Sequence, residues 1–133
     1  MSTMAPANLP RAFWFLLAAY LAASLLHFAH NAEFLAEYPN MPAWLTRAQV
    51  YGTWLGISAL GLAGCVLLRL GFRIAGLAVV ALYAAIGFDG LAHYTRAPLS
   101  DHTAMMNGTI WLEALTAALL LAMCAVLLVK RPS

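Results

Sequence analysis

The hydrophobic positions of this chain gather in four long runs separated by short polar segments. The runs predict helices over about residues 11–37, 46–69, 72–95 and 102–130. A helix needs about 20 mostly apolar residues to cross the hydrocarbon layer of a membrane, and each run supplies them. No run alternates apolar and polar residues with a period of two, so strands are not expected. The pattern predicts an all-α integral membrane protein, a bundle of four transmembrane helices forming a single domain over residues 1–133.

Residues that favour helix ends lie between these runs. Thr46 and Gln49 have the spacing of a capping box at the start of the second helix. Gly71 suits a tight connection between the second and third helices. Ser100 or Asp101 is expected to cap the fourth helix. The boundaries of the apolar runs are therefore supported by a second, independent signal.

Composition agrees with membrane insertion and excludes several other classes of protein. Hydrophobic residues make up 64% of the chain, charged residues 9%, and the mean hydropathy is +0.82. A soluble domain carries about 25% charged residues. The net charge of +2 forms no basic stripe, so a nucleic-acid partner is not expected. Cys65 and Cys124 both lie in apolar runs, where we expect them to pack as small apolar residues.

The basic residues are distributed unequally between the two ends of the predicted helices. One end holds Arg11, Arg69, Arg73, Lys130 and Arg131. The other end holds only Arg47 and Arg96. The positive-inside rule then places both termini in the cytoplasm and the first and third loops outside. We expect a bacterial inner-membrane protein with its outer loops in the periplasm.

The first apolar run has an alternative interpretation as a cleaved signal peptide. Arg11, the apolar stretch and the small residues Ala22, Ala23 and Ser24 resemble such a segment. The helical polar pattern continues past Ser24, so we expect this run to stay in the protein as its first transmembrane helix.

The histidines and acids all lie near the outer ends of the predicted helices. In the first helix His27, His30, Glu33 and Glu37 are spaced so that they share one face. Asp89 and His93 are four residues apart in the third helix, and Glu113 lies just inside the fourth. An ionisable side chain at membrane depth costs about 2.5–3.5 kcal/mol on insertion scales and normally faces the bundle interior. The sequence therefore predicts a polar cluster between the first, third and fourth helices.

A metal site is one chemistry that this cluster predicts. The expected ligands are His27, His30, His93 and Glu37. Histidines and carboxylates on facing helices hold metals in helical bundles, and zinc or iron suits these ligand types. Haem b between His93 and a histidine of the first helix is an alternative.

Copper is a further alternative for the metal. It would use the softer ligands of the outer loops, which are His102, Met41, Met105 and Met106.

Acid–base catalysis without a metal is the other chemistry that the cluster predicts. Glu113, Asp89 and Glu33 would act as carboxylates that exchange protons with the histidines. An enzyme of this kind would act on a lipid-like or apolar small molecule. A non-catalytic role also stays open, in which the polar residues only tie the helices together. The sequence does not decide whether the protein is an enzyme.

Partners and internal symmetry are the remaining expectations. The bilayer is the expected environment, and Gly56, Gly61 and Gly64 favour close packing of the second helix within the bundle or in a homo-oligomer or larger membrane complex. The stretches at 52–54 and 108–111 resemble each other. They suggest two repeated helical hairpins.

Overall fold

The computed structural model describes residues 8–130, and within that range every regular element is helical. Four helical segments are long and apolar enough to cross a membrane: α1 (Arg11–Glu33), α2 (Arg47–Arg69), the segment Arg73–Arg96, and α5 (Ala104–Val129). The third segment comprises α3 (Arg73–Ile86), η2 (Asp89–Ala92) and α4 (His93–Arg96). Short 3-10 turns, η1 (Leu35–Glu37) and η3 (Leu99–Asp101), occupy two of the connections. The four predicted helices are confirmed.

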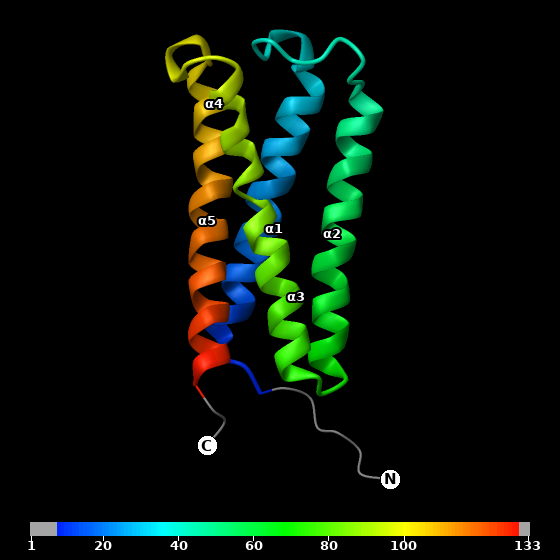
Figure 1. The fold of residues 1–133 in the computed structure, drawn as a ribbon, viewed down its shortest axis with the longest axis vertical. Coiled ribbons are helices and arrows are strands. Elements are labelled where there is room, and N and C mark those ends of the chain that lie inside the picture. Colours follow the sequence, from blue (N-terminus) through cyan, green and yellow to red (C-terminus); the bar gives the residue numbers. More distant parts are fainter. Residues whose placement is uncertain (1–7, 131–133) are drawn as a thin grey trace.

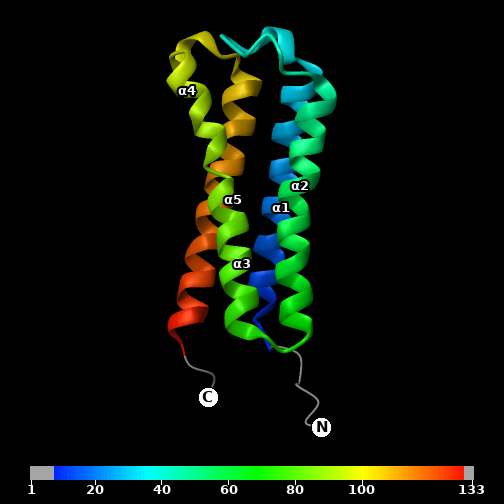
Figure 2. The same ribbon diagram turned by 45° about the vertical axis from the view of Figure 1, so that its right-hand side comes forward.

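The helices form an upright bundle in which neighbours along the chain run in opposite directions (Figures 1 and 2). The described part of the chain begins and ends at one end of the bundle, together with the turn between α2 and α3. The two longer connections lie at the opposite end, which we call the distal end. α1 packs most extensively on α5 and α2 on α3, whereas α1 and α2 contact each other less.

Most helix boundaries agree with the capping residues of the sequence. Thr46 and Gln49 form the predicted capping box of α2. Gly71 has a φ of 87°, a left-handed conformation that glycine adopts without strain. The expected cap of α5 by Ser100 or Asp101 is wrong. Both residues lie in η3, and Thr103 caps the helix by accepting a hydrogen bond from the Met106 amide.

Two of the predicted helices depart from a continuous α-helix near the distal end. α1 ends at Glu33, so Glu37 lies in a separate 3-10 turn and does not share the helix face of His27. The third helix changes from α to 3-10 geometry between Ile86 and His93. A 3-10 stretch inside a helix often marks a functional position or a strained sequence. These departures determine which polar side chains meet.

The half of the bundle near the termini has an apolar core, which includes Phe13, Leu68, Leu77 and Leu120. Gly64 lets α2 approach α3, because a Cβ there would lie 2.7 Å from Cγ2 of Val80. The predicted close packing of the second helix is thus confirmed at Gly64. At Gly56 an added Cβ would meet nothing within 4 Å. The polar groups considered next lie above this apolar core.

Candidate functional site

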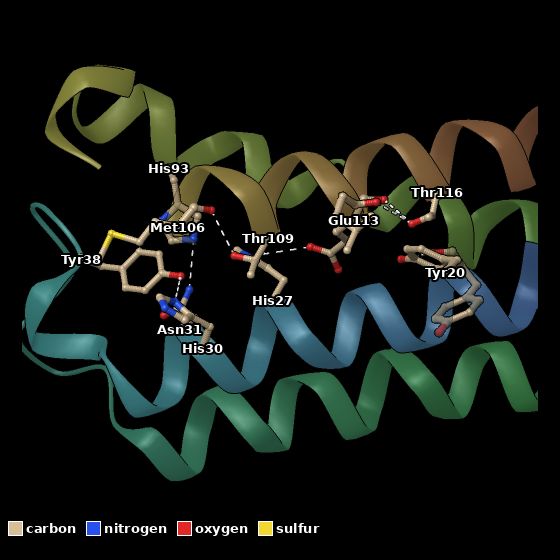
Figure 3. A network of polar contacts seen from close by, with 12 residues as sticks. Tyr20, His27, His30, Asn31, Tyr38, His93, Met106, Thr109, Glu113 and Thr116 are labelled. Carbon is tan, nitrogen blue, oxygen red and sulfur yellow. Dashed lines mark hydrogen bonds and ion pairs between the residues drawn. The ribbon is translucent and has the colours of Figure 1, made fainter. Parts of the chain in front are cut away.

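His27 of α1 and Glu113 of α5 meet inside the distal half of the bundle (Figure 3). The His27 Nε2 and Glu113 Oε2 atoms are 3.7 Å apart, and the side chains are only 3% and 2% exposed. The other four acidic residues of the chain are all exposed. Glu113 is therefore the one carboxyl of this protein that is removed from solvent, and its nearest basic group is a histidine.

Thr109, one helical turn before Glu113, determines how the His27 ring is protonated. Its hydroxyl donates to the backbone carbonyl of Met106 at 3.0 Å and lies 3.4 Å from His27 Nδ1. Because the hydroxyl proton is directed to the carbonyl, the Thr109 oxygen serves His27 as an acceptor. A neutral His27 then carries its proton on Nδ1 and presents the Nε2 lone pair to Glu113.

Gly90 brings the backbone of η2 against this pair. A Cβ at Gly90 would lie 3.2 Å from Oε2 of Glu113 and 3.4 Å from Nε2 of His27. The first distance is closer than ordinary van der Waals contact, and the second is at its lower limit. The 3-10 geometry and the missing side chain together allow the third helix to cover the His27–Glu113 pair closely.

A second layer of polar side chains lies between this pair and the distal end. Asn31 Nδ2 donates to His93 Nε2 at 3.0 Å. The His93 ring meets the His27 ring edge to face, with centroids 5.5 Å apart. The Tyr38 hydroxyl and His30 Nδ1 share a hydrogen bond of 2.9 Å, and the Tyr38 ring lies 4.9 Å from that of His93. Figure 3 shows these side chains converging from both sides of the bundle.

Tyr38 lies in the connection after α1, outside the candidate membrane spans, and it is only 3% exposed. Burial raises the pKa of its phenol to about 12. The phenol therefore stays protonated at neutral pH. Tyr38 is a buried member of the polar cluster, in contact with His30 and His93.

A cavity of about 230 Å³ adjoins the cluster. The polar side chains that line it include His27, Asn31 and His93, and the exposed residues Asp89 and Arg96 also contribute to its wall. The rest of the wall is mostly apolar and includes Met41, Leu45 and Val50. A small molecule in this cavity would touch His27 and His93 directly, while Glu113 lies behind His27.

Several buried polar atoms near the distal end have no hydrogen-bond partner among residues 8–130. They are Glu113 Oε2, Asn31 Oδ1, His93 Nδ1 and His102 Nε2. A buried polar group that forms no hydrogen bond typically costs about 1–3 kcal/mol. Such atoms gather at sites that bind a polar group, and three of these four residues belong to the cluster around the cavity.

The structure brings only some of the predicted site residues together. His27, His93 and Glu113 are buried in the cluster. Asp89 is exposed at the cavity wall. Glu33 lies on the surface, where its carboxylate accepts hydrogen bonds from Arg47 at 2.6 Å and Tyr51 at 2.7 Å.

The four predicted metal ligands, His27, His30, His93 and Glu37, do not form one ligand group. Across residues 8–130, no three His, Cys, Asp or Glu side chains are placed to hold a metal ion. His30 is engaged by Tyr38, and Glu37 is exposed in η1 because α1 ends before it. The edge-to-face contact of the His27 and His93 rings also differs from the arrangement of two ligands on opposite faces of a haem.

The four expected copper ligands have different surroundings. The Met106 sulfur accepts from the Thr103 amide at 3.5 Å, while Met105 is 60% exposed. Met41 lines the cavity, and the Nδ1 atom of His102 donates to the carbonyl of Pro98 at 3.0 Å.

Sequence reasoning missed three members of the cluster: Asn31, Thr109 and Gly90. Asn31 follows His27 by one helical turn and Thr109 precedes Glu113 by one turn, so helical spacing could have identified both. Nothing in the sequence marked Gly90, whose role depends on the 3-10 turn.

Comparison of the chain with protein-family models, with curated proteins and with solved structures finds no match.

Proposed function

We propose that this chain is a small four-helix membrane protein that transfers protons to and from a small molecule held at its distal end. The observation that carries the proposal is the buried contact of His27 with Glu113, beside a cavity that His27 lines. In the proposed orientation the distal end faces the periplasm, as the basic residues at the other end favour.

The pair suits proton transfer because its total charge need not change. A neutral imidazole beside a carboxylic acid and an imidazolium beside a carboxylate both have a net charge of zero. Moving the proton between Glu113 and His27 therefore avoids leaving an isolated charge in a region where charges are costly. His27 would exchange a proton with the bound molecule through Nε2, and Glu113 would supply or accept a proton at that same nitrogen.

The cavity wall indicates the class of substrate. It combines apolar side chains with the buried polar side chains of His27, Asn31 and His93, and the exposed residues Asp89 and Arg96 also contribute to it. This combination suits a small, mostly apolar molecule with one polar group, such as a carbonyl, that activates a neighbouring C–H bond. His27 would remove the proton from one carbon and return it to another, so the reaction would be an isomerisation that needs no oxidant or reductant.

Solvent deuterium tests this proposal. Membranes that contain the protein are incubated in D₂O with lipid-soluble extract of the producing cells, and mass spectrometry follows deuterium in carbon-bound positions. We expect one class of compound to gain deuterium with the wild type. The rate of this incorporation should be at least tenfold lower with Glu113→Gln. Glu33→Gln is the matched control, because Glu33 is an exposed carboxylate, and should behave as the wild type.

Equal labelling by the wild type and Glu113→Gln, or no labelling above membranes without the protein, would reject proton-transfer catalysis.

A second candidate function is that of a non-catalytic subunit in a membrane complex. It is favoured by α2, where Gly52 and Gly56 are exposed and an added Cβ would meet nothing within 4 Å. This face could receive a helix of a partner. Photo-crosslinking from Gly56 tests it: a defined protein adduct would support a subunit role, and adducts with lipid alone would reject it.

A further inference from the structure

A second cavity lies away from the polar cluster, in a groove between α1 and α2. Its volume is about 700 Å³. Its wall is mainly apolar and includes Trp14, Leu17, Leu21, Leu62 and Val66. α1 and α2 contact each other less than the other long neighbours do. The groove is therefore open to molecules dissolved in the surrounding lipid when the four helices cross a membrane.

Trp54, Ser58 and Tyr83 place polar groups on the wall of this groove, and Arg69, the last residue of α2, lines it as well. The Trp54 Nε1, Ser58 Oγ and Tyr83 hydroxyl atoms are buried and have no hydrogen-bond partner in the described part of the chain. Tyr83 itself is 1% exposed. All three groups can donate a hydrogen bond, and the indole can only donate.

Packing directs the Tyr83 side chain from α3 towards the groove. Its ring lies on Gly61 of α2, where an added Cβ would be 2.8 Å from the ring atom Cδ1. On the α1 side it meets the Tyr20 ring edge to face, at a centroid distance of 4.8 Å. The phenol therefore lies between α1 and α2, where the groove is.

The depth of these donors limits what could satisfy them. Ser58 is the middle residue of α2, about 16 Å from either end at roughly 1.5 Å per residue. In a membrane this is the centre of the hydrocarbon layer, which holds no water to bond the donors. The ester carbonyls of phospholipids lie near the interface, about 15 Å from the centre of a 30 Å core. An acceptor shared by all three donors would belong to a molecule that dissolves in the bilayer interior.

We propose that the groove binds a quinone with an apolar tail. A ring carbonyl would accept hydrogen bonds from Ser58 and Tyr83, with Trp54 available to the same ring. The tail would lie along the apolar wall towards Leu62 and Val66. A quinone combines strong carbonyl acceptors with solubility at this depth. It would offer an acceptor to the three donors, for which residues 8–130 provide no hydrogen-bond partner. This site is independent of the proton-transfer site.

Equilibrium binding to full-length protein in nanodiscs tests the proposal. The probe is decylubiquinone, and decylbenzene is the comparison molecule because it has a similar ring and tail without carbonyl groups. We expect saturable binding of the quinone only. Ser58→Ala and Tyr83→Phe each remove one donor and should weaken binding about fivefold, as the loss of one hydrogen bond does. Tyr51→Phe removes a hydroxyl outside the groove and should leave binding unchanged.

Equal binding of the two probes, or unchanged quinone binding in both groove variants, would overturn the proposal. If Tyr83→Phe lowers the thermal stability of the bundle, Ser58→Ala decides, because Ser58 is only partly buried on a helix face. Loss of quinone binding in Glu113→Gln would contradict the independence of the two sites.

Discussion

At the scale of single residues, the chemistry of this protein depends on how a few neighbours constrain His27. The Thr109 hydroxyl lies 3.4 Å from Nδ1 and favours a proton there, Glu113 faces Nε2, and His93 packs against the ring edge to face. Each of these groups alone is ordinary in a helical bundle. Together they keep a histidine and a carboxyl 3.7 Å apart and away from solvent, so a small approach would bring them to the hydrogen-bond distance that proton exchange requires.

The activity of the site is expected to be sensitive to a methyl group added at Gly90. In Gly90→Ala the new Cβ would lie 3.2 Å from Glu113 Oε2 and 3.4 Å from His27 Nε2, so the pair must move by a few tenths of an ångström. We predict a loss of at least tenfold in the deuterium incorporation described above, since small displacements in such a site are costly. Gly108→Ala is the control, because a Cβ there meets nothing within 4 Å. Unchanged incorporation in Gly90→Ala would show that the approach of η2 is not required.

Tyr38 gives a prediction for the dependence of stability on pH. Its pKa is raised from 10.0 to about 12, so the folded protein holds this proton more tightly than the unfolded chain does. The resulting stabilisation is fully present below about pH 10 and is lost as the pH rises towards about 12. Between these values the wild type should lose more thermal stability than Tyr38→Phe, measured by circular dichroism in detergent. Parallel curves for the two proteins would contradict a buried, raised-pKa phenol.

At the scale of elements, the break in the third helix shapes the site. Between Ile86 and His93 the chain uses 3-10 geometry, which turns His93 inward and leaves Asp89 exposed. The sequence could not show this, because the apolar run continues through the segment with helical spacing. It could show the four helices, the capping box at Thr46 and the left-handed glycine at Gly71, since these depend on local chemistry.

The side chains that each site residue contacts were harder to predict from the sequence than the depth of that residue in the bundle. Depth along a helix follows from counting residues, so the burial of His27 and Glu113 near the distal end could be anticipated. Which side chain each one faces depends on the rotation of every helix about its axis, and packing fixes that rotation. Glu33 illustrates this limit: it shares a helix with His27, yet it pairs with Arg47 on the surface.

Gly87, at the start of the break, is expected to be essential for packing. An added Cβ would lie 2.6 Å from Cε2 of Tyr20 and 2.7 Å from Cβ of Ala117, so α3 could not stay close to both α1 and α5. We predict that Gly87→Ala destabilises the bundle by about 1–3 kcal/mol, the usual range for overpacking. Reversible unfolding in detergent measures this, with Gly108→Ala again as the control. Equal stability of the two variants would mean that the break is not held by close packing.

At the scale of the whole molecule, the two ends of the bundle differ in character. The end near the termini has an apolar core and basic residues around it, whereas the distal end holds the histidines, the acids and the cavity. This asymmetry suits the proposed site, which would exchange molecules with one side of the membrane only.

The orientation of this asymmetry in the membrane can be measured directly. In a background with Cys65→Ala and Cys124→Ala, single cysteines are placed at Trp44, in the first distal connection, and at Leu70, in the turn between α2 and α3. Both positions are exposed, at 70% and 55%. A membrane-impermeant thiol reagent should label Trp44→Cys in intact bacterial cells and Leu70→Cys only after permeabilisation. The reverse pattern would place the distal end in the cytoplasm.

The most direct test of the central claim is ¹⁵N NMR of the histidines in the protein reconstituted in nanodiscs. His27→Asn assigns the His27 signals by their disappearance. We predict a proton on Nδ1 and a lone pair on Nε2, with an Nε2 signal that shifts in Glu113→Gln and not in Glu33→Gln. A proton fixed on Nε2, or an Nε2 signal indifferent to Glu113→Gln, would contradict a His27–Glu113 proton-transfer pair.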